Sequence, residues 1–254
     1  MPLDPACVID KHVIIRRAVD YDSNIKGTTG KGDCLNIESL NELIVEVIRV
    51  WNTQLLSLRT LEHLYMFLVA LFFSILIGVL IGTFTYRNQK LAAPVLNGLN
   101  VVETVPDVAL LVLLLPIFGI GTEPTIVASI LYSLLPIARN TYTGLSNVPR
   151  EYIEIAEALG LTQREVLFKV RFPLSLPLIA GGIRIAVVFT MGVVTLGGLI
   201  AAGGLGAALQ NGIQLYDMGT ILVTGAWVGL LAVLLDGIAG IIESTLKARY
   251  GTWS

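Results

Sequence analysis

The feature that most constrains this chain is a set of long apolar runs without charge. One such run, Leu64–Tyr86, has 23 uncharged residues, enough to cross a hydrocarbon core of about 30 Å as a helix. Hydrophobic residues make up 54% of the chain and charged residues only 14%, against about 25% charged in an ordinary soluble domain. These proportions exclude a disordered chain, a nucleic-acid binder and most soluble enzymes. They predict a polytopic protein that lies in the lipid bilayer.

The apolar runs predict an all-α integral membrane fold with five transmembrane helices. The predicted transmembrane domain covers residues 63–246. We expect its spans at about 64–86, 94–118, 124–140, 177–199 and 219–242.

Lysine and arginine predict how the spans are oriented. Two loops, at residues 119–123 and 201–219, contain no Lys or Arg, whereas the loops of the alternate set and the C-terminus hold nine. The nine are Arg87, Lys90, Arg139, Arg150, Arg164, Lys169, Arg171, Lys247 and Arg249. Because basic residues stay on the cytoplasmic side, we expect the N-terminus outside, the C-terminus inside and residues 247–254 to be a cytoplasmic tail.

The N-terminal region differs from the rest of the chain. Residues 1–36 are polar, and we expect them to form a disordered tail. A second interpretation is that this stretch is an artefact of a start codon assigned too far upstream. Residues 37–62 place apolar side chains at helical spacing with charges between them, which predicts an amphipathic helix at the membrane surface.

The cytoplasmic loop 146–173 has the chemistry of two short capped helices. Gly160 is a good stop for the first helix. Thr162 and Glu165 then form a capping-box pattern for the second, which we expect to end near Phe172, before Pro173. A rigid helix–turn–helix between spans is suited to docking a partner.

This loop resembles the EAA loop of type I ATP-binding-cassette (ABC) importer permeases. That pattern reads Glu-Ala-Ala-x3-Gly-x9-Ile-x-Leu-Pro, and Glu154, Ala156, Gly160 and Pro173 match it in position. Ile155, Val170 and Phe172 replace an Ala, an Ile and a Leu, apolar for apolar. The resemblance implies that the loop couples the permease to ATPase subunits. The residues it implicates are Glu154, Ala156, Glu157, Ala158, Gly160, Leu161, Thr162, Glu165, Phe172 and Pro173.

Further segments resemble the osmoprotectant permeases of this class, over roughly residues 60–245. They are Glu62–Tyr65, Thr104–Pro106, Leu134–Gly144 and Gly203–Gly206. The resemblance implies a MetI-like fold and a transmembrane path for glycine betaine, carnitine or choline. It also implies a separate solute-binding protein, separate ATPase subunits that carry out hydrolysis, and a second permease subunit, identical or paralogous. No catalytic residues, cofactor or metal site are expected.

Other solutes and other transport classes remain as alternatives. Methionine-type importers share the five-span plan and the Gly-Gly-Leu-Gly segment, so methionine or another small solute stays open. A secondary carrier is disfavoured because five spans do not divide into inverted halves. A channel would leave the capped cytoplasmic loop without a role.

Four charges and a glycine-rich segment in the membrane are candidate functional features. Glu103 and Asp107 share a helix face with Pro106, a predicted kink, between them. They line the path of a quaternary ammonium, pair with Arg139 or Arg184, or face the cytoplasmic vestibule. We expect a buried structural ion pair between Arg184 and Asp236. The glycines Gly203, Gly204 and Gly206 are expected to pack helices closely or to form an outer gate.

Overall fold

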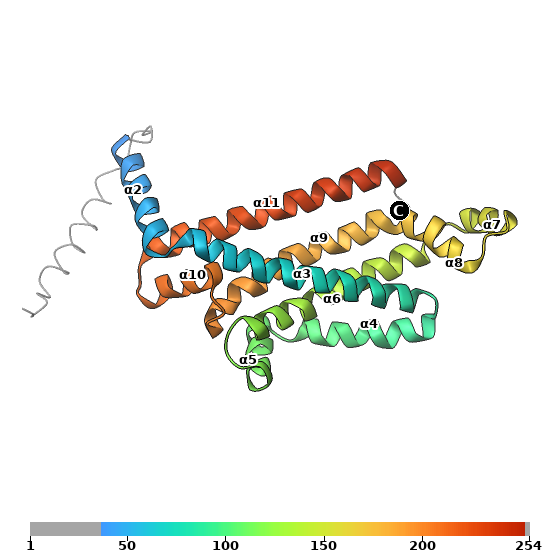
Figure 1. The fold of residues 1–254 in the computed structure, drawn as a ribbon, viewed down its shortest axis with the longest axis horizontal. Coiled ribbons are helices and arrows are strands. Elements are labelled where there is room, and N and C mark those ends of the chain that lie inside the picture. Colours follow the sequence, from blue (N-terminus) through green and yellow to red (C-terminus); the bar gives the residue numbers. More distant parts are fainter. Residues whose placement is uncertain (1–36, 252–254) are drawn as a thin grey trace, which may run out of the picture. The chain divides into compact units, whose positions relative to one another are not determined.

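The computed structural model describes residues 37–251, and every element in that range is a helix (Figure 1). The predicted tail 1–36 and the last three residues lie outside the described range. The chain divides into two compact units at Val45–Glu46. The account below concerns the unit from Glu46 onward.

The helices follow one another with short connections. In chain order they are α2 (Ile37–Thr53), α3 (Leu56–Tyr86), α4 (Gln89–Thr104), α5 (Asp107–Phe118), α6 (Thr122–Ser146), α7 (Arg150–Ala158), α8 (Gln163–Val166), the π-helix η2 (Leu167–Arg171), α9 (Phe172–Leu196), the 3₁₀-helix η3 (Gly197–Ile200), α10 (Gly204–Gln214) and α11 (Met218–Tyr250).

The helix α6 is central, with α3 and α9 packed against it and α11 against α9 (Figure 1). Small residues allow this approach. A Cβ added to Gly78 of α3 would lie 2.8 Å from Ile137 Cβ, and one on Gly182 of α9 would lie 2.7 Å from the Pro136 carbonyl oxygen. Close packing through small residues is the usual way in which membrane helices associate.

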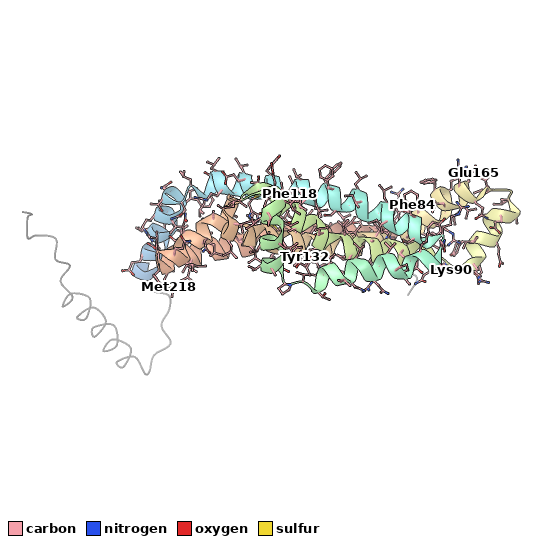
Figure 2. All side chains as sticks on the ribbon, turned by 90° about the horizontal axis from the view of Figure 1, so that it is seen from below. Phe84, Lys90, Phe118, Tyr132, Glu165 and Met218 are labelled. Atoms are coloured by element: carbon pink, nitrogen blue, oxygen red, sulfur yellow. The ribbon has the colours of Figure 1, made fainter. Side chains whose placement is uncertain are left out.

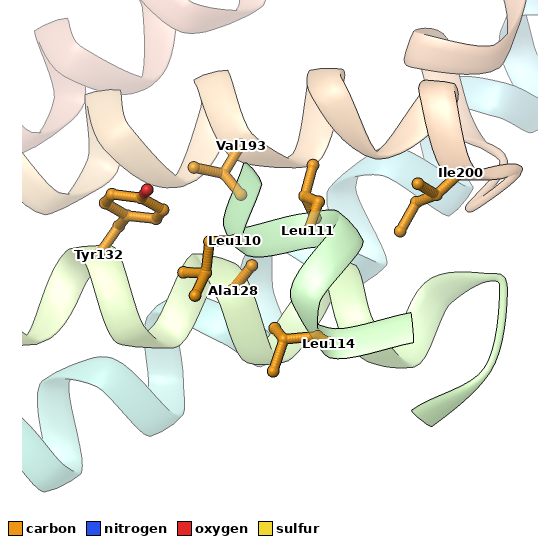
Figure 3. Packing of buried hydrophobic residues seen from close by; sticks show 7 residues of the cluster. All are labelled: Leu110, Leu111, Leu114, Ala128, Tyr132, Val193 and Ile200. Atoms are coloured by element: carbon orange, nitrogen blue, oxygen red, sulfur yellow. The ribbon is translucent and has the colours of Figure 1, made fainter. Parts of the chain in front are cut away.

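An apolar cluster joins the bent region of the chain to α6 and α9 (Figure 3). It buries three leucines of α5 against Ala128, Tyr132 and Val193, and Ile200 of η3 closes one end. The leucines are Leu110, Leu111 and Leu114. The cluster therefore fixes α5 on the helices that carry the candidate path.

Between Ile37 and Gly251, three helices are long and apolar enough to span a membrane, and a fourth is added if the bent pair α4–α5 is one span. The three are α3, the continuous helix Gln163–Ile200, and α11. The prediction of five spans is therefore not confirmed by length and composition. The helix α6 covers the span expected at 124–140, but it buries polar side chains such as Ser129 and Ser133. Because other helices surround α6, little of its surface needs to face lipid.

The span expected as one helix at 94–118 is instead two helices. The helices α4 and α5 meet at an angle of 99°. Val105 has φ −69° and ψ 131°, the extended conformation that a following proline favours. Pro106 thus produces a much sharper bend than the predicted kink.

The prediction of a single amphipathic helix over 37–62 is wrong, because two helices share this stretch. The helix α2 ends at Thr53, and Leu55 adopts a left-handed conformation with φ 51°. Residues 56–62 begin the long helix α3. At the break, the Arg59 side chain donates to the Gln54 carbonyl oxygen at 3.0 Å, which pairs an acceptor that the broken helix would leave free.

The helix that follows Thr162 does not end before Pro173, which corrects a further prediction. It passes through η2 into α9 without a break, and the Phe172 amide donates to the Leu167 carbonyl five residues back. A proline inside a helix removes a hydrogen bond and collides with the carbonyl four residues before it. The wider π-turn provides the room that the Pro173 ring needs.

Candidate docking and translocation sites

The turn between α7 and α8 is closed by a left-handed glycine. Gly160 has φ +80°. Its amide donates to the Glu157 carbonyl at 2.9 Å, and the Leu161 amide donates to the Ala156 carbonyl at 3.1 Å. These two bonds form a Schellman motif, which satisfies the last carbonyls of the helix. The turn therefore has one defined geometry.

The start of α8 is fixed by a reciprocal cap. The Glu165 amide donates to the Thr162 hydroxyl at 3.4 Å, and the Thr162 amide donates to the Glu165 carboxylate at 3.0 Å. Lys169 lies 2.8 Å from the same carboxylate. The Lys169 ammonium, with the Thr162 amide and hydroxyl, lowers the pKa of Glu165 to about 2. The carboxylate is thus ionised across the physiological range.

The segment α7–α8, which lies in the predicted coupling loop and is called the coupling segment below, buries one side and exposes an apolar face on the other. Ala156 and Val166 are buried, whereas Ile155 and Leu159 are 60% and 75% exposed. Glu154, Glu157 and Ala158 are exposed beside them, while Phe172 and Pro173 are half-buried. Figure 2 places Glu165 of this segment at the same end of the unit as Phe84 and Lys90, with Met218 at the opposite end.

The bend between α4 and α5 places Glu103 and Asp107 on one small cavity. The cavity measures about 150 Å³, and Tyr132, Phe189 and Val193 complete its lining. The Tyr132 hydroxyl donates to the Val105 carbonyl, so the central helix holds the bend in place. The cavity combines two carboxylates with two aromatic rings, a combination that favours a cation.

The two arginines considered as partners for these carboxylates are engaged elsewhere. Arg139 donates to the Asn100 side chain at 3.2 Å, and Arg184 binds Asp236. Within residues 37–251, neither arginine forms an ion pair with Glu103 or Asp107.

Arg184 joins α9 to α11 through two carboxylates. It donates to both oxygens of Asp236, at 2.7 and 2.8 Å, and to Glu243 at 3.3 Å. Lys247 lies 2.6 Å from the other oxygen of Glu243. The expected ion pair between Arg184 and Asp236 is present, but the side chains are 43% and 31% exposed. The prediction that the pair is buried is therefore wrong. Sequence reasoning did not include Glu243, although it lies seven residues after Asp236 on the same helix face.

The glycine-rich turn after α9 brings two backbones together. A Cβ on Gly198 would overlap the Gly206 carbonyl group, and one on Gly206 would overlap the Thr195 carbonyl. Gly203 and Gly204 have φ +85° and +62°, and the Gly204 amide donates to the Glu62 carboxylate at 2.9 Å. Glu62 was predicted only as part of a family-like segment. Its carboxylate meets the positive end of α10.

These features belong to a known class of membrane protein. The family model for binding-protein-dependent transport system inner membrane components matches residues 74–248. This chain belongs to that family. The permease is therefore a multi-pass protein of the cytoplasmic membrane, and its role is transport.

Curated relatives place the permease among osmoprotectant permeases. It is 40% identical over 203 residues to the osmoprotectant import permease protein OsmW of Salmonella typhimurium, covering 78% of this chain and 94% of that one. It is 37% identical to the glycine betaine/carnitine/choline transport system permease protein OpuCB of Bacillus subtilis, over 75% of this chain and 88% of that one. The resemblance predicted from the motifs is confirmed.

Solved structures confirm the fold class. The permease is 27% identical to a chain of the MetNI methionine ABC transporter in an inward-facing conformation. The TM-score is 0.67, and the match covers 74% of this chain and 94% of that one. The predicted MetI-like, all-helical membrane fold is therefore correct.

Proposed function

We propose that the permease forms the translocation path of an ATP-driven importer for an osmoprotectant with a quaternary ammonium group, such as glycine betaine, carnitine or choline. The observation that carries this proposal is the identity of 34–37% with relatives named for these solutes, together with 40% identity to a relative named for osmoprotectant import. A further relative, the ergothioneine transport permease/ergothioneine binding protein EgtU of Helicobacter pylori, is 38% identical over 173 residues, which make up 31% of that protein. All four named solutes carry a trimethylammonium group.

The cavity at the α4–α5 bend supports the same class of solute. Glu103 and Asp107 supply negative charge, and the rings of Tyr132 and Phe189 supply faces for cation–π contact. The cavity of about 150 Å³ is small, so it is suited to a trimethylammonium head and not to a whole solute. We place Glu103, Pro106 and Asp107 along the path.

The coupling segment supports a separate source of energy. We infer that ATPase subunits dock on residues 146–173, with the exposed apolar face of Ile155 and Leu159 and the carboxylate of Glu154 as the contact. Hydrolysis takes place in those subunits. The permease works by shifting between two states that bind ATP-loaded and ATP-free ATPases differently.

The remaining partners and roles follow from this scheme. A second permease subunit, identical or paralogous, completes the path, and a separate binding protein delivers the solute from outside. Gly203, Gly204 and Gly206 form the outer gate near the predicted external end. The Arg184–Asp236 pair holds α9 against α11 during the change of state.

Solute uptake tests the proposal. The permease is expressed with its binding protein and ATPase in cells that lack osmoprotectant importers, and uptake of labelled choline, glycine betaine, carnitine and methionine is measured. We expect at least one trimethylammonium solute to accumulate, and accumulation to cease with a hydrolysis-deficient ATPase. Methionine uptake in the absence of trimethylammonium uptake would favour the methionine-type alternative, for which the MetNI likeness at 27% identity is weaker support.

A further inference from the structure

A second polar cavity lies where three long helices end, away from the acidic cavity. It measures about 300 Å³ and is lined by Tyr86 at the end of α3, Ser146 at the end of α6, and Gln163, Arg164 and Arg171 ahead of α9, with Arg87 beside them. The lining contains three guanidinium groups and no carboxylate. This charge balance favours an anion over a cation.

The arginines have few partners of their own. Arg171 donates to the Leu145 carbonyl at 2.8 Å and lies over the Tyr86 ring at 5.7 Å. Across the described range, none of the three forms an ion pair with a carboxylate. Three arginines without a carboxylate partner that line one cavity are suited to an oxyanion such as phosphate, because each planar guanidinium offers several parallel donors.

Ser146, which also lines this cavity, has a hydroxyl that the protein covers. The Ser146 Oγ atom is buried and has no hydrogen-bond partner among the described residues. A buried polar atom without a partner carries a free-energy cost of about 1–3 kcal/mol. Because the Oγ atom is covered, the anion site rests on the three arginines and not on this hydroxyl.

The location favours a lipid as the source of the anion. Tyr86 ends the first membrane-spanning helix, a position where aromatic residues sit at the headgroup level. Phe84, two residues earlier, is 76% exposed and stands out from α3 in Figure 2. An arginine-lined cavity beside an exposed apolar helix surface matches a headgroup with its acyl chains, and basic pockets at the cytoplasmic ends of helices are typical lipid sites.

We infer that this cavity binds a phosphate-type oxyanion, and that its source is the phosphodiester headgroup of an anionic phospholipid. The headgroup contacts Arg87, Arg164 and Arg171 and leaves its acyl chains along α3. A lipid bound in this way links the end of the first span to the start of the coupling segment.

The test is lipid binding by the purified full chain, measured by native mass spectrometry in mild detergent. The probes are phosphatidylglycerol, phosphatidylcholine and inorganic phosphate. The variants are Arg164→Gln and the double variant Arg87→Gln/Arg164→Gln. The matched control is Arg139→Gln, which removes an exposed guanidinium that lies outside the cavity.

We expect phosphatidylglycerol to bind at least tenfold more tightly than phosphatidylcholine. Each arginine removed should weaken phosphatidylglycerol binding about tenfold, the effect of losing one charge-assisted contact, while Arg139→Gln changes it less than twofold. Photocrosslinking of a phosphatidylglycerol probe to the wild-type chain, with peptides around Tyr86 and Gln163 as the expected sites, supports the site without relying on a folded variant.

Three results would overturn the inference. Equal losses in the cavity variants and Arg139→Gln would reduce it to general surface charge. Binding of inorganic phosphate without preference for phosphatidylglycerol would assign the cavity to a free anion. Loss of ATPase co-purification in Arg87→Gln/Arg164→Gln, with lipid binding intact, would make the arginines a protein-docking surface.

Discussion

At Gly198 and Gly206 the chain has room for a hydrogen atom and nothing larger. Gly198 faces the backbone of Gly206, and Gly206 faces the backbone of Thr195. Because backbone atoms are in the way, no side-chain rotation can make space for a methyl group. Overpacking of this kind costs typically 1–3 kcal/mol. These two glycines are therefore set by packing, whatever movement the turn makes during transport.

Replacement of Gly206 by alanine should destabilise the permease by about 1–3 kcal/mol, seen as a lower apparent Tm in detergent. Gly192 is the matched control because a Cβ at that position meets nothing within 4 Å. Gly192→Ala should leave the Tm unchanged or raise it, since alanine is favoured over glycine in helices by about 1 kcal/mol. Equal effects of the two changes would contradict the packing argument.

Residue-scale features could be predicted from sequence when their partners are local. Gly160 and the Thr162–Glu165 cap depend on atoms within six residues, and both have the expected geometry. Glu62, Glu243 and Ser146 could not be identified in this way. Their environments come from Gly204, Arg184 and the arginine-lined cavity, which tertiary packing alone brings near them.

At the scale of elements, helix boundaries depend on where the chain finds hydrogen-bond partners. The segment after Thr162 was expected to end at Pro173, and the π-turn carries it through. The helix α2 was expected to continue to residue 62, and a left-handed Leu55 ends it early. Neither the π-turn nor Leu55 has a distinct sequence signal, whereas Pro106 does, and only the size of its bend was missed.

The element-scale prediction concerns the coupling segment. Glu154→Arg should abolish co-purification of the ATPase, because it reverses a charge beside the exposed Ile155 and Leu159. Membrane insertion should be normal, since Glu154 is exposed. The test is a pull-down from mild detergent of tagged permease co-expressed with the ATPase.

The control for this pull-down is Glu123→Arg, the same charge reversal on an exposed residue. Glu123 lies at the start of α6, whereas the coupling segment follows the end of α6. It should retain the ATPase. If Glu154→Arg also co-purifies with a full complement of ATPase, residues 146–173 are not the docking element.

At the scale of the whole molecule, composition and apolar runs were sufficient to predict a helical membrane protein, and the EAA-like pattern around Glu154 and Gly160 indicated its family. Composition and apolar runs were not sufficient to establish the number of spans, because α6 is shielded by its neighbours and the pair α4–α5 is bent by 99°. Length and hydropathy report how a helix meets lipid. They do not report helices that meet mostly other helices.

Orientation is the prediction at this scale. With Cys7 and Cys34 replaced by serine, single cysteines are introduced as Glu123→Cys and Arg150→Cys. In right-side-out vesicles, a membrane-impermeant maleimide should label Glu123→Cys at once and Arg150→Cys only after permeabilisation, because basic loops stay inside. The reverse pattern would place the coupling segment outside and exclude ATPase docking there.

The uninterrupted helix Gln163–Ile200 connects the coupling segment directly to the glycine-rich turn. Its 38 residues correspond to a length of about 57 Å at 1.5 Å per residue, more than the thickness of the hydrocarbon core. One end lies in the coupling segment and the other enters the glycine-rich turn. A stiff helix carries a displacement of one of its ends to the other end without a relay of intermediate contacts. In the proposed scheme, a displacement that the ATPases impose on residues 146–173 is carried along this helix to the glycine-rich turn at its other end.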